Sequence, residues 1–135
     1  MALQLSVAVR NAMLDAIETA IGTSAVLKIR TGAPPASVAT ADSGTVLATL
    51  TLPSDWMAAA SAGSKAKSGT WEDASADAAG TAAHYRIYAS DGTTAHLQGT
   101  VTATGGGGDL VVDNAVFAAG QSFSITSFSI TAPNS

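Results

Sequence analysis

Residues 83–102 read AHYRIYASDGTTAHLQGTVT, a stretch that predicts a β-hairpin turning at Ser90-Asp91-Gly92. A two-residue Asp91-Gly92 loop would mix apolar and charged side chains on each face of the hairpin. A three-residue loop, with Gly92 in the left-handed conformation, gathers the apolar residues on one face: Ala83, Tyr85, Ile87, Leu97, Gly99 and Val101. The polar residues then share the other face: His84, Arg86, Tyr88, Thr94, His96 and Gln98.

Further strands are predicted on both sides of this hairpin. Alternating side chains predict one strand through Leu27 and Ile29 and a second over residues 45–52. Near the end, Ser122-Phe-Ser-Ile-Thr126 is followed at once by Ser127-Phe-Ser-Ile-Thr131. Because a period of five reverses the buried face, we expect a bend where the two copies meet. The pattern predicts a mainly β fold, an antiparallel, jelly-roll-like β-sandwich.

The start of the chain predicts one amphipathic helix, because apolar residues recur there every four positions. The expected apolar stripe consists of Leu5, Val9, Met13 and Ile17, within a helix or arm at residues 4–22. Gly22 can end the helix, since glycine accepts the left-handed conformation. The stripe can dock on the sheet of its own chain, on a sister subunit or on a larger partner, and the sequence does not choose among the three.

The length of 135 residues predicts a single domain, with the sandwich over residues 24–135. Within it, residues 54–80 are expected to form a long irregular loop rich in small side chains, with a short strand around Thr70 and Trp71. So long a loop in a small domain suggests that something external orders it. Trp56 and Trp71 flank this loop and are candidate interface anchors, although the scarcity of large apolar residues favours burial of at least one.

Charge and composition exclude several classes of protein. Six basic against ten acidic residues give a net charge of −4, the wrong sign for neutralising phosphates, so no nucleic-acid partner is expected. The absence of cysteine excludes disulfides and thiolate chemistry. No run approaches the roughly 18 apolar residues of a membrane span, and the start lacks the pattern of a signal peptide. We expect a soluble protein made in the cytoplasm, without a membrane partner.

Catalytic and metal-binding patterns are weak. His84 and His96 are too few for a metal site, so no metal or cofactor is expected. Residues 105–109 lack the Lys and Ser/Thr of a phosphate-binding loop, and no nucleophile elbow is present. The carboxylates of Glu72, Asp73 and Asp77 lack the aromatic platforms of a glycosidase site. We expect no enzymatic activity. The polar face of the hairpin is instead a candidate contact surface, sensitive to pH near neutrality.

Two blocks resemble a family of small virion proteins of tailed bacteriophages: Leu27-Lys-Ile-Arg-Thr-Gly-Ala-Pro-Pro-Ala36 and Ala41-Asp-Ser-Gly-Thr-Val-Leu-Ala-Thr-Leu50. The similarity continues at residues 75–81, 85–93 and 127–133, and so covers most of the chain from Leu27 onwards. The resemblance implies a capsid decoration, or cement, protein with a jelly-roll-like sandwich. It also implies a homo-oligomer, a dimer or a trimer, seated on the capsid lattice, and it brings no catalytic residues.

We therefore expect a structural protein of the virion, made in the host cytoplasm, that bridges neighbouring copies of the major capsid protein and stabilises the shell by avidity. The alternative is a carbohydrate- or receptor-binding sandwich on a tail or fibre, with Trp56, Trp71, Tyr85 or Tyr88 as a stacking platform. The candidate interface residues are Leu5, Val9, Met13, Ile17, Trp56, Trp71, His84, Arg86 and His96.

Overall fold

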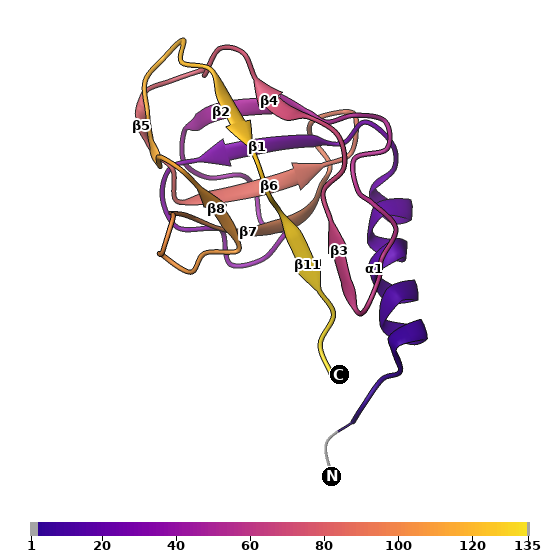
Figure 1. Ribbon diagram of the computed structural model, residues 1–135. Helices are drawn as coiled ribbons and strands as arrows, with labels where there is room; N and C mark the ends of the chain where they lie inside the picture. Colours follow the sequence, from indigo (N-terminus) through magenta and orange to yellow (C-terminus); the bar gives the residue numbers. More distant parts are fainter. Residues whose placement is uncertain (1–2, 135) are drawn as a thin grey trace.

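The computed structural model describes residues 3–134 and has a mainly β, sandwich-like fold with a helix at its N-terminal end (Figure 1). Within these residues the elements are, in chain order, α1 (Val7–Ile21), β1 (Val26–Arg30), β2 (Val46–Thr51), β3 (Ser64–Ala66), β4 (Trp71–Asp73), β5 (Gly80–Thr81), β6 (His84–Tyr88), β7 (Ala95–Ala103), β8 (Leu110–Val112), β9 (Val116–Phe117), β10 (Phe123–Ile125) and β11 (Ser129–Thr131). The predicted helix and the predicted strands around Leu27 and residues 45–52 are confirmed.

The largest sheet has the strand order β2-β1-β6-β7-β8 and curls along its length (Figure 1). Its first four strands pair antiparallel, as expected, but β7 and β8 are parallel, with Val101 opposite Leu110. The chain makes this return through the glycine-rich turn at residues 105–108, and a carboxylate oxygen of Asp109 accepts a hydrogen bond from Thr100 N at 3.0 Å. The glycine run is thus a turn between neighbouring strands.

The predicted faces of the β6–β7 hairpin are confirmed. Ile87 pairs with Leu97 and Tyr85 pairs with Gly99, so the apolar residues share the face that packs into the core. The predicted three-residue loop is wrong in its length, because Ala89 N donates to Thr94 O and four residues lie between them. His96 is an extra, unpaired residue in β7. This bulge shifts the register by one residue and so returns the apolar side chains of both strands to the same face.

The repeated SFSIT sequence forms two strands in different small sheets. β10 pairs with β4 and β11 pairs with β3, while β5 pairs with β9. The chain breaks from strand geometry between Ile125 and Ser129, and this break keeps Phe123, Ile125 and Phe128 buried in one core. The predicted bend between the copies is confirmed. In Figure 1, β3 lies between β11 and α1.

An aromatic cluster joins the small sheets to the large one. The Phe128 ring lies 5.5 Å from that of Trp71 and 5.8 Å from that of Tyr85, measured between centroids, and Trp71 lies 6.1 Å from Trp56. Both tryptophans are fully buried, and their indole N–H groups donate to Gly22 O and Ser68 O. Burial of at least one tryptophan is therefore confirmed. Their role as interface anchors is wrong, because neither side chain reaches the surface.

Residues 54–80 are ordered by their own chain, which corrects the expectation of an external support. Ala58 N donates to Ala66 O, Asp77 N donates to Leu47 O, and Thr49 N donates to the carboxylate of Asp73. The segment also contains β4, which confirms the short strand expected around Trp71, and β3, which the sequence did not indicate. A strand as short as β3 carries too little alternation to be recognised.

We predict that Phe128→Ala lowers the free energy of unfolding by about 3–5 kcal/mol, because it leaves a cavity between Trp71 and Tyr85. Urea denaturation followed by circular dichroism measures this difference. Val116→Ala is the matched control, since its side chain is 59 % exposed and its truncation is expected to change stability by less than about 0.5 kcal/mol. Equal effects of the two substitutions would contradict the assignment of Phe128 to the core.

Candidate functional site: the outer face of the N-terminal helix

The ends of α1 follow from the local sequence. Ser6 is the N-cap, and its hydroxyl accepts a hydrogen bond from Val9 N at 3.2 Å. At the other end Gly22 has φ +94°, and its N–H donates to Glu18 O at 2.9 Å. These caps place the helix within the predicted residues 4–22. The helix packs against β3, beside the large sheet (Figure 1).

Except for the exposed Thr19, the polar side chains of α1 contact the inner part of the chain, Asp15 from the edge of the helix, where its side chain is 49 % exposed. The buried guanidinium of Arg10 donates from Nε and Nη2 to Ala132 O, at 3.3 and 2.9 Å. Asn11 accepts from Gly63 N, and Asp15 accepts from Ala60 N. The side chains of Arg10, Asn11 and Asp15 therefore form their hydrogen bonds with other segments of the same chain.

Lys65 from β3 is the centre of this inner contact. Its side chain is only 2 % exposed, and its ammonium lies 2.7 Å from a carboxylate oxygen of Asp15 and 3.0 Å from one of Glu18. Burial alone would lower the pKa of Lys65, but the hydrogen bonds and charges of the two carboxylates outweigh it and raise that pKa. The hydrogen bond from Lys65 correspondingly lowers the pKa of Asp15.

The predicted stripe does not dock as a whole on the sheet of its own chain. Docking on a sister subunit or on a larger partner stays a prediction. Val9 and Met13 are 46 % and 43 % exposed, whereas Leu14 and Ile21 are buried. Leu5 and Ile17 are only half-buried, and Ile17 lies at the edge of the core. The helix has apolar residues on two sides, and the side that docks is the one whose carboxylates can neutralise Lys65. A four-residue period could not distinguish these two sides.

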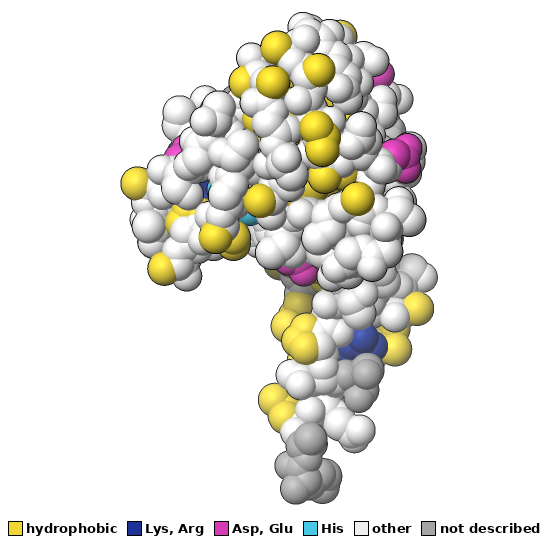
Figure 2. Space-filling model, turned by 90° about the vertical axis from the view of Figure 1, so that its left-hand side faces the viewer, with side chains coloured by type: hydrophobic (Ala, Val, Ile, Leu, Met, Phe, Trp, Pro, Cys, Tyr) yellow, Lys and Arg dark blue, Asp and Glu magenta, His cyan; other side chains and the backbone are white. Residues whose placement is uncertain are grey.

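The outer face of α1 is consequently free of charge. Its exposed side chains are Val7, Ala8, Val9, Ala12, Met13, Ala16, Thr19 and Ala20. The face continues N-terminally into Leu3, which is 71 % exposed. Figure 2, which views the molecule from the side away from α1, shows hydrophobic side chains on its narrow lower part as well. A surface helix usually exposes its charged residues, whereas here they lie on the inner side together with Leu14 and Ile21.

The two ends of the described chain lie together at this narrow end (Figure 1). Leu5 N donates to Asn134 O at 2.8 Å, and Arg10 holds the carbonyl of Ala132. The segment after β11 is therefore fastened beside the start of the helix. This contact fixes the place at which the exposed N-terminal residues leave the body of the molecule.

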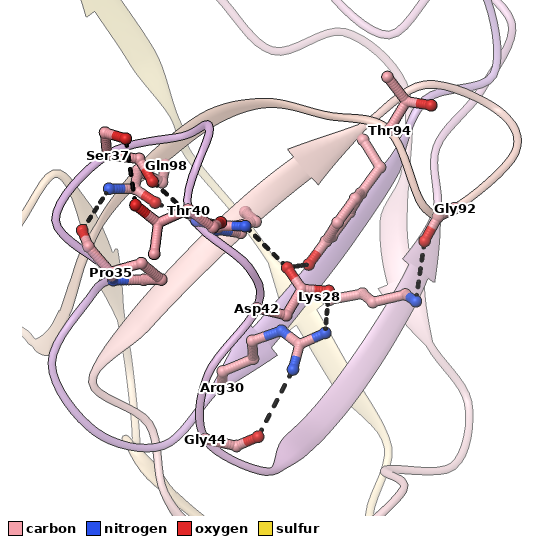
Figure 3. Close-up of polar contacts among 12 residues, drawn as sticks. Lys28, Arg30, Pro35, Ser37, Thr40, Asp42, Gly44, Gly92, Thr94 and Gln98 are labelled. Atoms are coloured by element: carbon pink, nitrogen blue, oxygen red, sulfur yellow. Dashed lines mark hydrogen bonds and ion pairs between the residues drawn. The ribbon is translucent and has the colours of Figure 1, made fainter.

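The polar face of the hairpin is not a free surface, which corrects the prediction for His84 and Arg86. The loop at residues 31–45 covers this face, and both side chains are buried beneath it. One guanidinium nitrogen of Arg86 lies 2.8 Å from Asp42, and the other donates to Ser37 O and Thr40 O (Figure 3). His96 stays exposed, because its extra position in β7 carries it outside the covered region.

Side chains of the large sheet hold this loop by its backbone carbonyls. Besides Arg86, the donors are Arg30 to Gly44 O at 3.5 Å and Gln98 to Pro35 O at 2.8 Å (Figure 3). The Nδ1 atom of His84 lies 2.7 Å from Gly32 O, a contact that requires the Nδ1–H tautomer.

Asp42 is the loop's anchor. Its carboxylate binds Arg86, Arg30 at 3.0 Å and the hydroxyl of Tyr88 at 2.8 Å (Figure 3). Partial burial opposes ionisation of Asp42, but the Tyr88 hydrogen bond and the two guanidinium charges outweigh it and lower the pKa of this carboxyl. Burial, followed by the hydrogen bond to Asp42, raises the pKa of Tyr88.

The aromatic platform expected for a carbohydrate-binding module is not on the surface. Trp56, Trp71, Tyr85 and Tyr88 are all buried. Burial, reinforced by the charge of Asp109, raises the pKa of Tyr85. These four rings therefore belong to the core and to the covered sheet face.

The remaining candidate groups have structural roles. Asp73 and Asp77 accept hydrogen bonds from Thr49, at 2.9 and 2.8 Å, and so fasten β4 and the following loop to β2. Across residues 3–134, no three His, Cys, Asp or Glu side chains are close enough together to hold a metal ion. No helix in the same range is long and apolar enough to cross a membrane.

We predict that Asp42→Asn destabilises the protein by about 2 kcal/mol at pH 7, less than for a fully buried ion pair because Asp42 is 37 % exposed. The pKa of Asp42 is lower in the folded than in the unfolded chain. Its contribution is therefore complete above about pH 4 and is lost as the pH falls through the folded-state value. Urea unfolding of both proteins at several pH values should show the difference shrinking in acid.

The matched control is Asp113→Asn, which neutralises an exposed carboxylate after β8 and should leave stability within about 0.5 kcal/mol of the unsubstituted protein. A difference for Asp42→Asn that stays constant down to the acid limit would exclude the ionised carboxylate as its cause.

Comparisons of this chain with protein-family models, with curated proteins and with solved structures found no match. Among the described residues, the outer face of α1 departs most clearly from what a free-standing domain needs. Monomeric proteins rarely expose large contiguous apolar patches, and such patches mark sites of association.

Proposed function

We propose that this protein is a structural component of a bacteriophage virion, a capsid decoration protein that binds the capsid lattice and bridges its subunits. The observation that carries the proposal is the charge-free outer face of α1, on a helix whose charged groups all serve inner contacts. In this proposal the chain acts by association and catalyses no reaction.

The physical reason is the cost of leaving this face in water. Each Å² of apolar surface removed from water is worth about 25 cal/mol, so covering Val7, Val9, Met13 and Leu3 favours association. A helix that served only its own fold would place Lys or Glu at such positions, since both form helices well and stay hydrated. Alanine and valine there are consistent with a face that is covered in the working state.

The fastened loop at residues 31–45 supports the same proposal. Binding a lattice requires a surface that loses little conformational freedom on contact. The carbonyls of this loop are already held by Arg30, Arg86 and Gln98, so its shape is set before any partner arrives. The sequence resemblance to small virion proteins includes this region. Repeated weak contacts over a lattice then add up through avidity.

We predict that Val9→Asp combined with Met13→Asp removes the protein from purified particles, because two carboxylates would have to be buried without partners. Particles from hosts that express each variant can be compared by mass spectrometry and by cryo-electron microscopy. Occupancy should fall by at least about tenfold, which is the loss expected for 1.4 kcal/mol. The particles should also lose resistance to heat or chelators.

Val116→Asp is the matched control, because it places a carboxylate on a residue that is 59 % exposed and outside the helix. It should leave occupancy unchanged. Absence of the unsubstituted protein from capsids, or its presence only at the tail, would refute the decoration role. Unchanged occupancy of the double variant would show that the helix face does not support attachment.

A further inference from the structure

We infer that the outer face of α1 is the seam of a two-fold symmetric dimer, in which it packs antiparallel against the same face of a second copy. This inference rests on the proposed function and names a second copy, in place of the capsid surface, as the partner of this face. The dimer then meets the lattice through its other surfaces, each present twice, and breaking the seam weakens attachment by removing this avidity. The dimer itself forms in the free protein and does not require a capsid. The inference goes beyond a general expectation of oligomers, because it states which residues meet and in which direction.

The spacing along the face suits helix-to-helix packing. Val9, Met13, Ala16 and Ala20 follow one another at intervals of four, three and four residues, which is the spacing of a coiled-coil seam. Ala8 and Ala12 flank this seam and let a second helix backbone approach closely. All six side chains are exposed, so the seam is available along the whole helix.

The distribution of size along the seam selects the antiparallel direction. The large side chains, Val9 and Met13, occupy its N-terminal half, and the small ones, Ala16 and Ala20, occupy its C-terminal half. A parallel pair would put Met13 against Met13 and leave a gap at Ala20. An antiparallel pair puts each large residue opposite a small one, which fills the contact evenly. It also places the two helix dipoles in opposite directions.

A hollow at the C-terminal end of α1 is consistent with the antiparallel arrangement. Its volume is about 410 Å³, and it is lined by Glu18, Thr19, Gly22, Thr23, Ser54 and Asp55. In an antiparallel pair the partner's N-terminal segment runs past this end of the helix. Leu3 and Val7, which are 71 % and 51 % exposed, can then cover the walls of the hollow. Stable interfaces bury at least about 1,000 Å² in total, and this second contact extends the short helix seam.

Charge favours a second copy over other partners. Recognition of a different protein relies on complementary charges, and the outer face of α1 has none to offer. Permanent interfaces between identical subunits are the apolar class. With a net charge of −4, two copies repel each other weakly, and they approach most easily through an uncharged face. A membrane surface is disfavoured, because helices that bind one carry Lys and Arg on the side facing water.

We predict that the full chain sediments as a dimer at micromolar concentration and that Met13→Asp raises the dissociation constant by about 100-fold, since the carboxylate would be buried without a partner. Analytical ultracentrifugation over a concentration series measures this constant. Ala16→Arg should have a similar effect while preserving helix propensity. Val116→Asp should remain dimeric. Circular dichroism of each variant checks that the fold is retained.

Cysteine cross-linking tests the direction, because the chain contains no cysteine of its own. Mixing Val9→Cys with Ala20→Cys under mild oxidation should yield the disulfide-linked mixed dimer. Oxidation of Val9→Cys alone should give little product, since residues 9 of the two copies lie at opposite ends of the seam. Efficient linkage of Val9→Cys to itself would overturn the antiparallel arrangement.

The outcomes separate this inference from the proposed function. A chain that is monomeric at every concentration, yet attaches to capsids through its helix, overturns the dimer and leaves the decoration role intact. A dimer broken by Met13→Asp in a protein that is absent from capsids supports the seam and refutes the decoration role. A dimer insensitive to both Met13→Asp and Ala16→Arg places the interface elsewhere and overturns the inference.

Discussion

The buried ammonium group of Lys65 constrains the whole N-terminal half of the molecule. A charge so deeply buried is tolerated only with opposite charges beside it, and Asp15 and Glu18 supply them from α1. The helix therefore turns its carboxylates inward, where a surface helix would normally place leucine or isoleucine. Its remaining apolar residues are left outside as a consequence, and the uncharged face is exposed because these ion pairs take the inner side.

Buried cations are also paired with a carboxylate from another segment on the polar face of the large sheet. There the buried cations belong to the sheet, Arg30 and Arg86, and the carboxylate of Asp42 comes from the covering loop. In both places a short irregular segment or helix is attached by polar groups to a chain that has few large apolar residues. Hydrogen-bonded ion pairs thus supplement a thin core, and they fix position more strictly than apolar contacts do because their geometry is directional.

The features that could be predicted from the sequence are those that depend on the alternation of apolar and polar residues along a single strand. The faces of the hairpin around Ile87 and Leu97, and the bend in the SFSIT repeat, both follow from which residues must share one side of a strand. The docking side of α1 could not be predicted in this way, because the choice depends on Lys65, about fifty residues away. The polar side of the hairpin was recognised as polar, yet its cover is a distant loop. Burial of Arg86 depends on Asp42, and no local pattern connects the two.

The hydrogen bond from Leu5 N to Asn134 O brings the beginning and the end of the described chain within reach of each other. A few residues of linker would close this gap, and the glycine turn at residues 105–108 offers an exposed place to open the chain instead. A circularly permuted version of the protein is therefore geometrically accessible. Cargo attached after Asn134 would emerge next to the N-terminal segment, at the narrow end of the molecule, and not from the sheet.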